Sequence, residues 1–151
     1  MKLNKNISDS NISISYLDEI KYRLAISEIS ILPSELIISY IQEFVSDKEQ
    51  QDELISTAQK SKSFGFYSRL NVPSQMRGQN IGSLLLNETI KACEEQDVFL
   101  VNTVNPYGDL THEQLISFYE RHGMRSINEG VLIYSKHLPQ INKQPSKAPK
   151  I

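Results

Sequence analysis

A strand, a helix and a second strand follow one another within residues 63–104, and this segment constrains the fold more than any other. The second strand, VFLVNTV at 98–104, is almost entirely apolar, as expected of a strand that is buried on both faces. The first strand, SFGFYSRLNV at 63–72, ends at Pro73, which has no N–H group for a sheet ladder. With a helix from about Asn80 to Glu95 between them, the two strands are predicted to be parallel and joined by a right-handed crossover.

The segment ahead of this unit shows both strand and helix patterns. ISISYL at 12–17 and YRLAISEISI at 22–31 alternate apolar and polar residues, which predicts a hairpin. A helix is predicted to begin at Ser34, and a second helix at Asp47, which has capping-box spacing with Gln50. The first of these helices carries a wide apolar stripe made of Leu36, Ile37, Tyr40, Ile41, Phe44 and Val45.

The last third of the chain adds one helix and one strand. Thr111 and Gln114 have the spacing of a capping box, which predicts a helix start, and Gly123 is the expected residue just after the helix end. GVLIYSKHL at 130–138 is predicted to be the final strand. Together these patterns predict an α/β protein with a mixed central β-sheet flanked by helices.

Length and composition indicate a single domain over residues 1–138 that is followed by a tail. Residues 139–151 hold three prolines and three lysines and have little to bury, which predicts disorder. The formal net charge of −2 produces no field that favours nucleic acid as a partner. The single cysteine, Cys93, indicates a reducing compartment, and no apolar run approaches the ~20 residues of a membrane span. We therefore expect a cytoplasmic protein with no membrane partner.

The turn ahead of the helix at 80–95 is a candidate phosphate site. It contains Gly78 and Gly82, two of only six glycines in the chain, with Asn80 between them and Arg77 just before them. Unpaired N–H groups and the positive end of the helix dipole favour a phosphate at a helix N-terminus. Glycine also lets a ligand approach the backbone closely.

Three phosphate-binding motifs compete for this turn. A P-loop requires a lysine after its last glycine, and Gly82 is followed by serine and leucine. A dinucleotide-binding fingerprint requires an acidic residue near the end of the next strand, which here reads Val101-Asn102-Thr103. The third motif is the coenzyme A loop, R/Q-x-x-G-x-G/A.

The third motif carries a resemblance to a known family. Residues 70–90, LNVPSQMRGQNIGSLLLNETI, and residues 115–124, LISFYERHGM, resemble the cofactor motif and the later tyrosine motif of the GNAT superfamily of N-acetyltransferases. The resemblance covers about residues 63–136 and implies the acyl-CoA N-acyltransferase fold. The chain departs from the family pattern at Asn80, where the motif has glycine, and at Met124, where phenylalanine is usual. The two early helices also fall directly before the loop strand.

The resemblance further implies acetyl-CoA as cosubstrate. No metal ion is expected, because the three histidines of the chain are too dispersed to suggest a metal site. An amine would attack the acetyl thioester directly, through a tetrahedral intermediate. Tyr119 matches the position that often protonates the departing thiolate, whereas its helical spacing from Leu115 alone favours core packing. The residues implied to bind the thioester and pantetheine arm are Leu70, Asn71 and Val72, and those implied to bind the pyrophosphate are Arg77, Gly78, Gln79, Asn80, Ile81, Gly82 and Ser83.

Five other residues are weaker candidates. Glu28 is a candidate general base by residue type alone, and a solvated strand carboxylate is the competing interpretation. His112 and His122 lie in the first and last turns of a predicted helix and are expected at the surface. Arg121 and Arg125 are candidates for contact with the 3′-phosphate of the cofactor.

Different classes of function remain open. The first is an N-acetyltransferase whose acceptor is a primary amine, such as a protein lysine or N-terminus, a small amine or a charged tRNA, and the pI near 5.9 argues against the last. The second is a non-catalytic coenzyme A-binding or interaction module. The third is an effector that acetylates and inactivates one specific protein. The final strand and the apolar helix at 34–46 offer surfaces for a homodimer.

Overall fold

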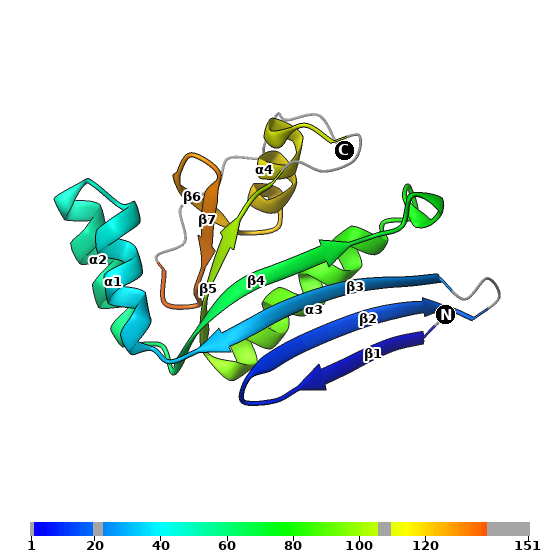
Figure 1. Ribbon diagram of the computed structural model, residues 1–151, viewed down its shortest axis with the longest axis horizontal. Helices are drawn as coiled ribbons and strands as arrows, with labels where there is room; N and C mark the ends of the chain where they lie inside the picture. The colour runs from blue at the N-terminus through cyan, green and yellow to red at the C-terminus, as the bar shows by residue number, and fades with distance from the viewer. Residues whose placement is uncertain (1, 20–22, 106–109, 139–151) are drawn as a thin grey trace.

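The computed structural model of the chain describes residues 2–19, 23–105 and 110–138, which form one mixed sheet with helices on both faces (Figure 1). The tail predicted at 139–151 lies outside the described residues. The strands are β1 (Lys2–Ile7), β2 (Asn11–Asp18), β3 (Arg23–Leu32), β4 (Ser63–Asn71), β5 (Val98–Thr103), β6 (Arg125–Asn128) and β7 (Val131–Tyr134). The helices are α1 (Glu35–Phe44), α2 (Lys48–Gln59), the short 3₁₀ helix η1 (Ser74–Met76), α3 (Ile81–Gln96) and α4 (His112–Arg121). The predicted α/β class is confirmed.

The described strands are arranged in the order β1-β2-β3-β4-β5-β7-β6, with one parallel pair. β4 and β5 are parallel and are connected through α3, as the strand–helix–strand pattern predicted. The other neighbouring pairs are antiparallel. β1, β2 and β3 follow one another in the sheet, and α1 and α2 are inserted in the chain between β3 and its neighbour β4.

The sheet separates two apolar cores. α3 and α4 cover one face, where Leu85 and Leu115 belong to the buried cluster, and α1 and α2 cover part of the other face, where Ile41 is buried. β5 contributes to both cores, because Leu100 faces α3 and Val101 faces α1 and α2. The prediction that this strand is buried on both faces is therefore confirmed.

The helix ends follow the signals in the sequence. Asp47 accepts a hydrogen bond from the Gln50 N–H at 3.0 Å. Thr111 and Gln114 form a complete capping box at the start of α4. Gly123 follows α4 with φ 100°, in the left-handed region that glycine adopts without strain. These predicted helix boundaries are confirmed.

Some predicted boundaries and faces are wrong. The strand predicted over 130–138 ends at Tyr134 in the structure, and the short strand β6 before it was not predicted. β1 was not predicted either, because five of its six residues are exposed and it shows no apolar alternation. The apolar stripe of α1 is also narrower than the sequence suggests, because Leu36 and Phe44 are 51% and 39% exposed.

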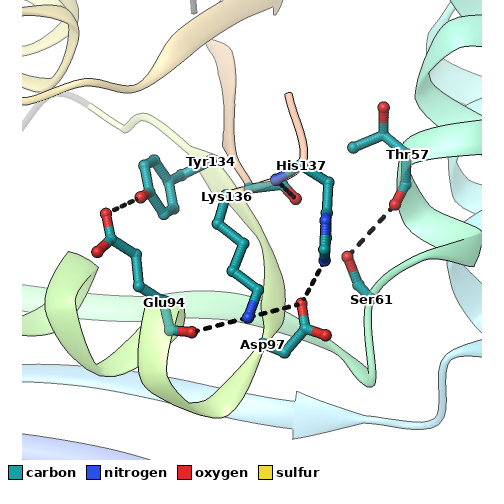
Figure 2. A network of polar contacts seen from close by, with 8 residues as sticks. Thr57, Ser61, Glu94, Asp97, Tyr134, Lys136 and His137 are labelled. Atoms are coloured by element: carbon teal, nitrogen blue, oxygen red, sulfur yellow. Dashed lines mark hydrogen bonds and ion pairs between the residues drawn. The ribbon is translucent and has the colours of Figure 1, made fainter. Parts of the chain in front are cut away.

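Polar contacts attach the chain beyond β7 to the end of α3 (Figure 2). His137 Nε2 lies 2.8 Å from Asp97 Oδ1, and Lys136 Nζ lies 4.0 Å from the same oxygen. Tyr134 donates a hydrogen bond to the Glu94 carboxylate. Burial, together with this carboxylate, raises the pKa of the Tyr134 hydroxyl, so it remains a donor at neutral pH. These contacts fix the position at which the chain leaves the sheet.

Candidate active site

β4 and β5 diverge where their pairing ends (Figure 1). A cleft lies between them. The two strands pair from Ser63 with Val98 to Phe66 with Val101. β4 then continues beside β3 as far as Asn71, while β5 stays paired with β7. The facing edges of the two strands are therefore not paired with each other beyond this point. The cleft has a volume of about 340 Å³ and is lined by Tyr67, Ser68, Arg69, Leu70, Asn71, Asn102, Thr103, Val104, Asn105, Leu115 and Tyr119.

A β-bulge in β4 shapes one wall of the cleft. The register between β3 and β4 shifts at this point, which leaves Ser68 as an extra residue in β4. Because of this extra residue, Tyr67 and Leu70 both contact the core under α3. Arg69 instead lies on the other face, with its Nε 3.8 Å from the Glu28 carboxylate. A bulge also bends its strand, which agrees with the separation of β4 from β5.

Tyr119 of α4 lines the cleft beside Tyr67 of β4. Its side chain is 6% exposed, and its ring centroid is 6.1 Å from that of Tyr67 and 5.4 Å from that of Phe118. Leu115, one helical turn earlier, lines the same cleft. The sequence left open whether Tyr119 packs in the core or belongs to a site. In the structure its ring is packed against other rings and the residue also borders the cleft.

A chain of buried hydroxyl groups leads from Tyr67 into the core. Thr89 Oγ1 donates its only proton to the Leu85 carbonyl at 2.7 Å, so it must accept from Ser27 Oγ, which lies 2.6 Å away. Ser27 in turn accepts from the Tyr67 hydroxyl. Burial raises the pKa of this hydroxyl far above its ordinary value, although the hydrogen bond with Ser27 opposes the shift. The Tyr67 proton is therefore held by Ser27 at any physiological pH.

The glycine turn forms the N-terminus of α3. Asn80 is the N-cap residue, with φ 60°, and its side chain makes no capping hydrogen bond. The first helical hydrogen bond runs from the Leu84 N–H to the Asn80 carbonyl, so the N–H groups of residues 81–83 precede it. Gly78 has φ 82°, in the left-handed region that favours glycine. The backbone of the turn thus has the helix-end donors that the sequence predicted.

The residues predicted to bind the cofactor divide into two groups. Leu70 and Asn71 line the cleft, together with Tyr119. The second group does not line the cleft and lies in the segment from the end of β4 to the first turn of α3. It consists of Val72 and residues 77–83.

The two groups are connected through α4. A Cβ atom at Gly82 would lie 3.6 Å from the ring of Phe118, which is the neighbour of Tyr119 in α4. The turn itself is closed by Arg77, whose Nε donates to the Val72 carbonyl at 3.2 Å. The first turn of α3 is therefore adjacent to the helix that carries the cleft tyrosine.

Neither Tyr67 nor Asn102 was predicted as a site residue, although both border the cleft. They are the first residues of β4 and β5 beyond the last parallel pair, Phe66 with Val101. Asn102 is 4% exposed. The available signal in the sequence was a carboxamide in the mostly apolar run at 98–104.

The two histidines of α4 are half-buried, which corrects the expectation that they lie at the surface. His122 Nδ1 lies 2.6 Å from the Phe118 carbonyl. The His112 ring lies against the backbone of Gly130, where a Cβ atom would be 2.8 Å from its Nε2. Both rings therefore pack at the ends of their helix.

Arg125, Arg121 and the single cysteine do not line the cleft. Arg125 forms a 2.6 Å ion pair with Glu53 of α2, on the face opposite α3. Arg121 is half-buried, and within the described residues its Nε has no hydrogen-bond partner. Cys93 is 1% exposed, and burial raises the pKa of its thiol to about 12. The thiol is therefore a packing group.

Searches for a metal site, a membrane span and similar proteins give no further indication of function. In the ranges 2–19, 23–105 and 110–138, no group of three or more histidine, cysteine, aspartate or glutamate side chains is arranged to hold a metal ion. No helix in that part of the chain has the length and apolar character needed to cross a bilayer. Comparison of the chain with protein-family models, curated proteins and solved structures finds no match.

Proposed function

We propose that the protein is an acetyl-CoA-dependent N-acetyltransferase with the acyl-CoA N-acyltransferase fold. The observation that carries the proposal is the cleft between the parallel strands β4 and β5. This cleft brings Leu70 and Asn71, neighbours at the end of β4, together with Tyr119 of α4, which lies far from them in the chain. The resemblance to the GNAT superfamily assigns these same three residues to one reaction. Their common location supports the resemblance independently of the sequence motifs.

In this proposal the pantetheine arm of acetyl-CoA binds along the edge of β4 from Leu70 to Val72. That edge is not paired with β5 beyond Phe66, so an extended ligand with amide groups can hydrogen-bond there as a strand would. The pyrophosphate binds to the N–H groups of residues 81–83, which precede the first helical hydrogen bond of α3. Arg77 is exposed beside this turn and adds positive charge.

The reaction is a direct transfer to a primary amine. The amine nitrogen forms a bond to the acetyl carbon, the carbon–sulfur bond breaks, and the leaving thiolate takes up a proton. N–H groups of the β4 edge stabilise the negative charge on the thioester oxygen. Tyr119 donates the proton to the thiolate, and its place in the cleft wall supports this role. Glu28 is ion-paired with Arg69, so we assign no general base.

Thermal unfolding with and without acetyl-CoA tests the cofactor assignment. A ligand present at a hundredfold excess over its Kd stabilises the fold by about 2.7 kcal/mol, which raises Tm measurably. We expect this rise for the wild type and expect Gly82→Asp to abolish it, because a carboxylate would then stand at the phosphate site. Asparagine has the same size as aspartate without the charge, so Gly82→Asn should lose less of the rise in Tm. No rise for the wild type at millimolar acetyl-CoA would refute the proposal.

A non-catalytic coenzyme A-binding module is the second candidate. The burial of Tyr119 and its contacts with Tyr67 and Phe118 favour this alternative, because they are sufficient to explain the residue by packing. Release of free thiol from acetyl-CoA in the presence of a panel of primary amines separates the two candidates. An enzyme produces thiol in proportion to acetylated amine, whereas a module binds acetyl-CoA and produces neither.

A further inference from the structure

Asn102 is a buried carboxamide located where β4 and β5 begin to separate. Its side chain is 4% exposed and borders the cleft. Within the described residues this side chain makes one hydrogen bond, from Nδ2 to Met124 Sδ at 3.8 Å. A carboxamide can donate two hydrogen bonds and accept two, so most of its capacity is unused. Burial of such a group is unfavourable unless a partner is supplied, and the adjacent cleft is where a partner can enter.

Met124 determines which end of the carboxamide faces the cleft. A thioether sulfur can accept a hydrogen bond but cannot donate one, so the amide turns its nitrogen toward Met124. Met124 is 1% exposed and does not line the cleft, so Nδ2 points into the core. Oδ1 is the end that remains for a ligand. Phenylalanine, which is usual at this place in the motif that the chain resembles, has no sulfur to accept this bond.

The groups around Asn102 make its oxygen a neutral acceptor. Tyr67, the corresponding residue of β4, already donates its proton to Ser27. Among the described lining residues the charged one is Arg69, which is paired with Glu28. A carboxylate at this position would favour the ammonium form of a bound amine and raise its pKa. A neutral carboxamide does so far less, and a nucleophilic amine must lose its charge before it attacks.

We infer that Asn102 Oδ1 binds the acceptor amine by accepting a hydrogen bond from its N–H group. The inference rests on the proposed N-acetyltransferase function and adds a binding residue for the acceptor. Asn102 holds the nitrogen at the point where the two strands diverge, and Met124 keeps the carboxamide oxygen turned toward it.

Side-chain amide NMR of the full ¹⁵N-labelled chain tests the inference, with butylamine as the probe. The Asn102 signal is identified by its loss in Asn102→Leu, and its shift is followed on adding butylamine, coenzyme A or both. We expect butylamine to move this signal and its affinity to fall about tenfold in Asn102→Leu, which corresponds to one hydrogen bond. Coenzyme A affinity should not change. Asn105→Leu, which alters an exposed carboxamide of the same cleft, should leave butylamine affinity unchanged.

Met124→Leu provides a second variant that does not remove the carboxamide. Methionine and leucine have similar volumes, so the fold should persist while the hydrogen bond that orients the amide is lost. We expect weaker butylamine binding in this variant, by a smaller factor than in Asn102→Leu. Equal butylamine affinity in the wild type and in both variants would overturn the inference.

Two further outcomes are decisive. An Asn102 signal that moves with coenzyme A and not with butylamine would assign the residue to the cofactor and overturn the inference. No binding of butylamine to the wild type would overturn it as well. The proposed function is judged separately by acetyl-CoA binding and thiol release. If the wild type and Asn102→Leu acetylate amines equally well, the proposed function stands and the inference fails. If butylamine binds at Asn102 but acetyl-CoA does not bind, the inference stands and the proposed function fails.

Discussion

Ser27→Ala and Tyr67→Phe break the same hydrogen bond, yet they should destabilise the fold by different amounts. The direction of the hydroxyl chain explains why. In Ser27→Ala the Tyr67 hydroxyl loses its acceptor, and its proton remains buried without a partner. In Tyr67→Phe the donor itself is removed, and Ser27 still donates to Thr89. Both Ser27 and Thr89 are 1% exposed, so water offers little replacement.

The magnitudes follow from the difference between a buried donor without an acceptor and a hydrogen bond removed with its donor. A buried polar group without a partner costs about 1–3 kcal/mol, and a typical hydrogen bond contributes about 1 kcal/mol net. We therefore expect Ser27→Ala to lower the free energy of unfolding by about 2 kcal/mol and Tyr67→Phe by about 1 kcal/mol or less. The double variant lacks the buried Tyr67 hydroxyl that has no acceptor in Ser27→Ala, so it should be more stable than Ser27→Ala alone.

Urea denaturation followed by far-UV circular dichroism suits this chain, which has no tryptophan. A loss of 2 kcal/mol should lower Tm by about 4–8 °C in a domain of this size. Ser30→Ala is the matched control, because Ser30 bonds Ser68 on the other face of the sheet and is partly solvated. If Tyr67→Phe is as costly as Ser27→Ala, or if the double variant shows the sum of the two losses, the direction assigned to the hydroxyl chain is wrong.

Three further predictions concern Tyr119, Cys93 and the ion pair of Glu88 with Lys5. Tyr119→Phe keeps the ring contacts and should preserve Tm and acetyl-CoA affinity while single-turnover rates fall by about 10² or more; an unchanged rate would mean that another group protonates the thiolate. The Cys93 thiol, with its pKa raised to about 12 by burial, should resist labelling at pH 8 until the chain unfolds, and rapid labelling of the folded protein would contradict its burial. The hydrogen bond from Lys5, at 2.5 Å, lowers the pKa of Glu88, so the pair stabilises the fold above the ordinary carboxyl pKa and loses this effect as the pH falls through the lowered value. Glu88→Gln should therefore be less stable than the wild type at pH 7, and the difference should shrink below about pH 4, as titrating urea midpoints would show.

Elements with strong local signals could be predicted from the sequence. Pro73 cannot continue a ladder, and β4 ends two residues before it. Thr111 and Gln114 are close enough in the chain to form their capping box without any tertiary contact. Tyr119 was placed by its spacing from Leu115 on an amphipathic helix. In each case the responsible interaction joins residues within about one turn or one strand, so a short window of sequence contains it.

The parts of the site that were not predicted depend on residues far apart in the chain. The hydroxyl chain joins Ser27, Tyr67 and Thr89, which lie on β3, β4 and α3. The bulge at Ser68 exists because β3 and β4 pair out of regular register, and no residue of β4 alone indicates it. Asn102 borders the cleft because the parallel pairing of β4 and β5 ends beside it, and this pairing cannot be read from β5 alone. The edge strands β1 and β6 were missed for a related reason, since five of six residues of β1 and two of four of β6 are exposed to solvent.

The insertion of α1 and α2 between two neighbouring strands sets the order in which this sheet can assemble. β1, β2 and β3 are close in the chain and can pair early, whereas β3 and β4 pair only after residues 33–62 have been closed into a loop. The bulge and the cleft both lie beside this late contact. We therefore expect substitutions along the cleft wall of β4 to accelerate unfolding more than they slow folding, so the region proposed to carry the reaction is also the region whose contacts break early.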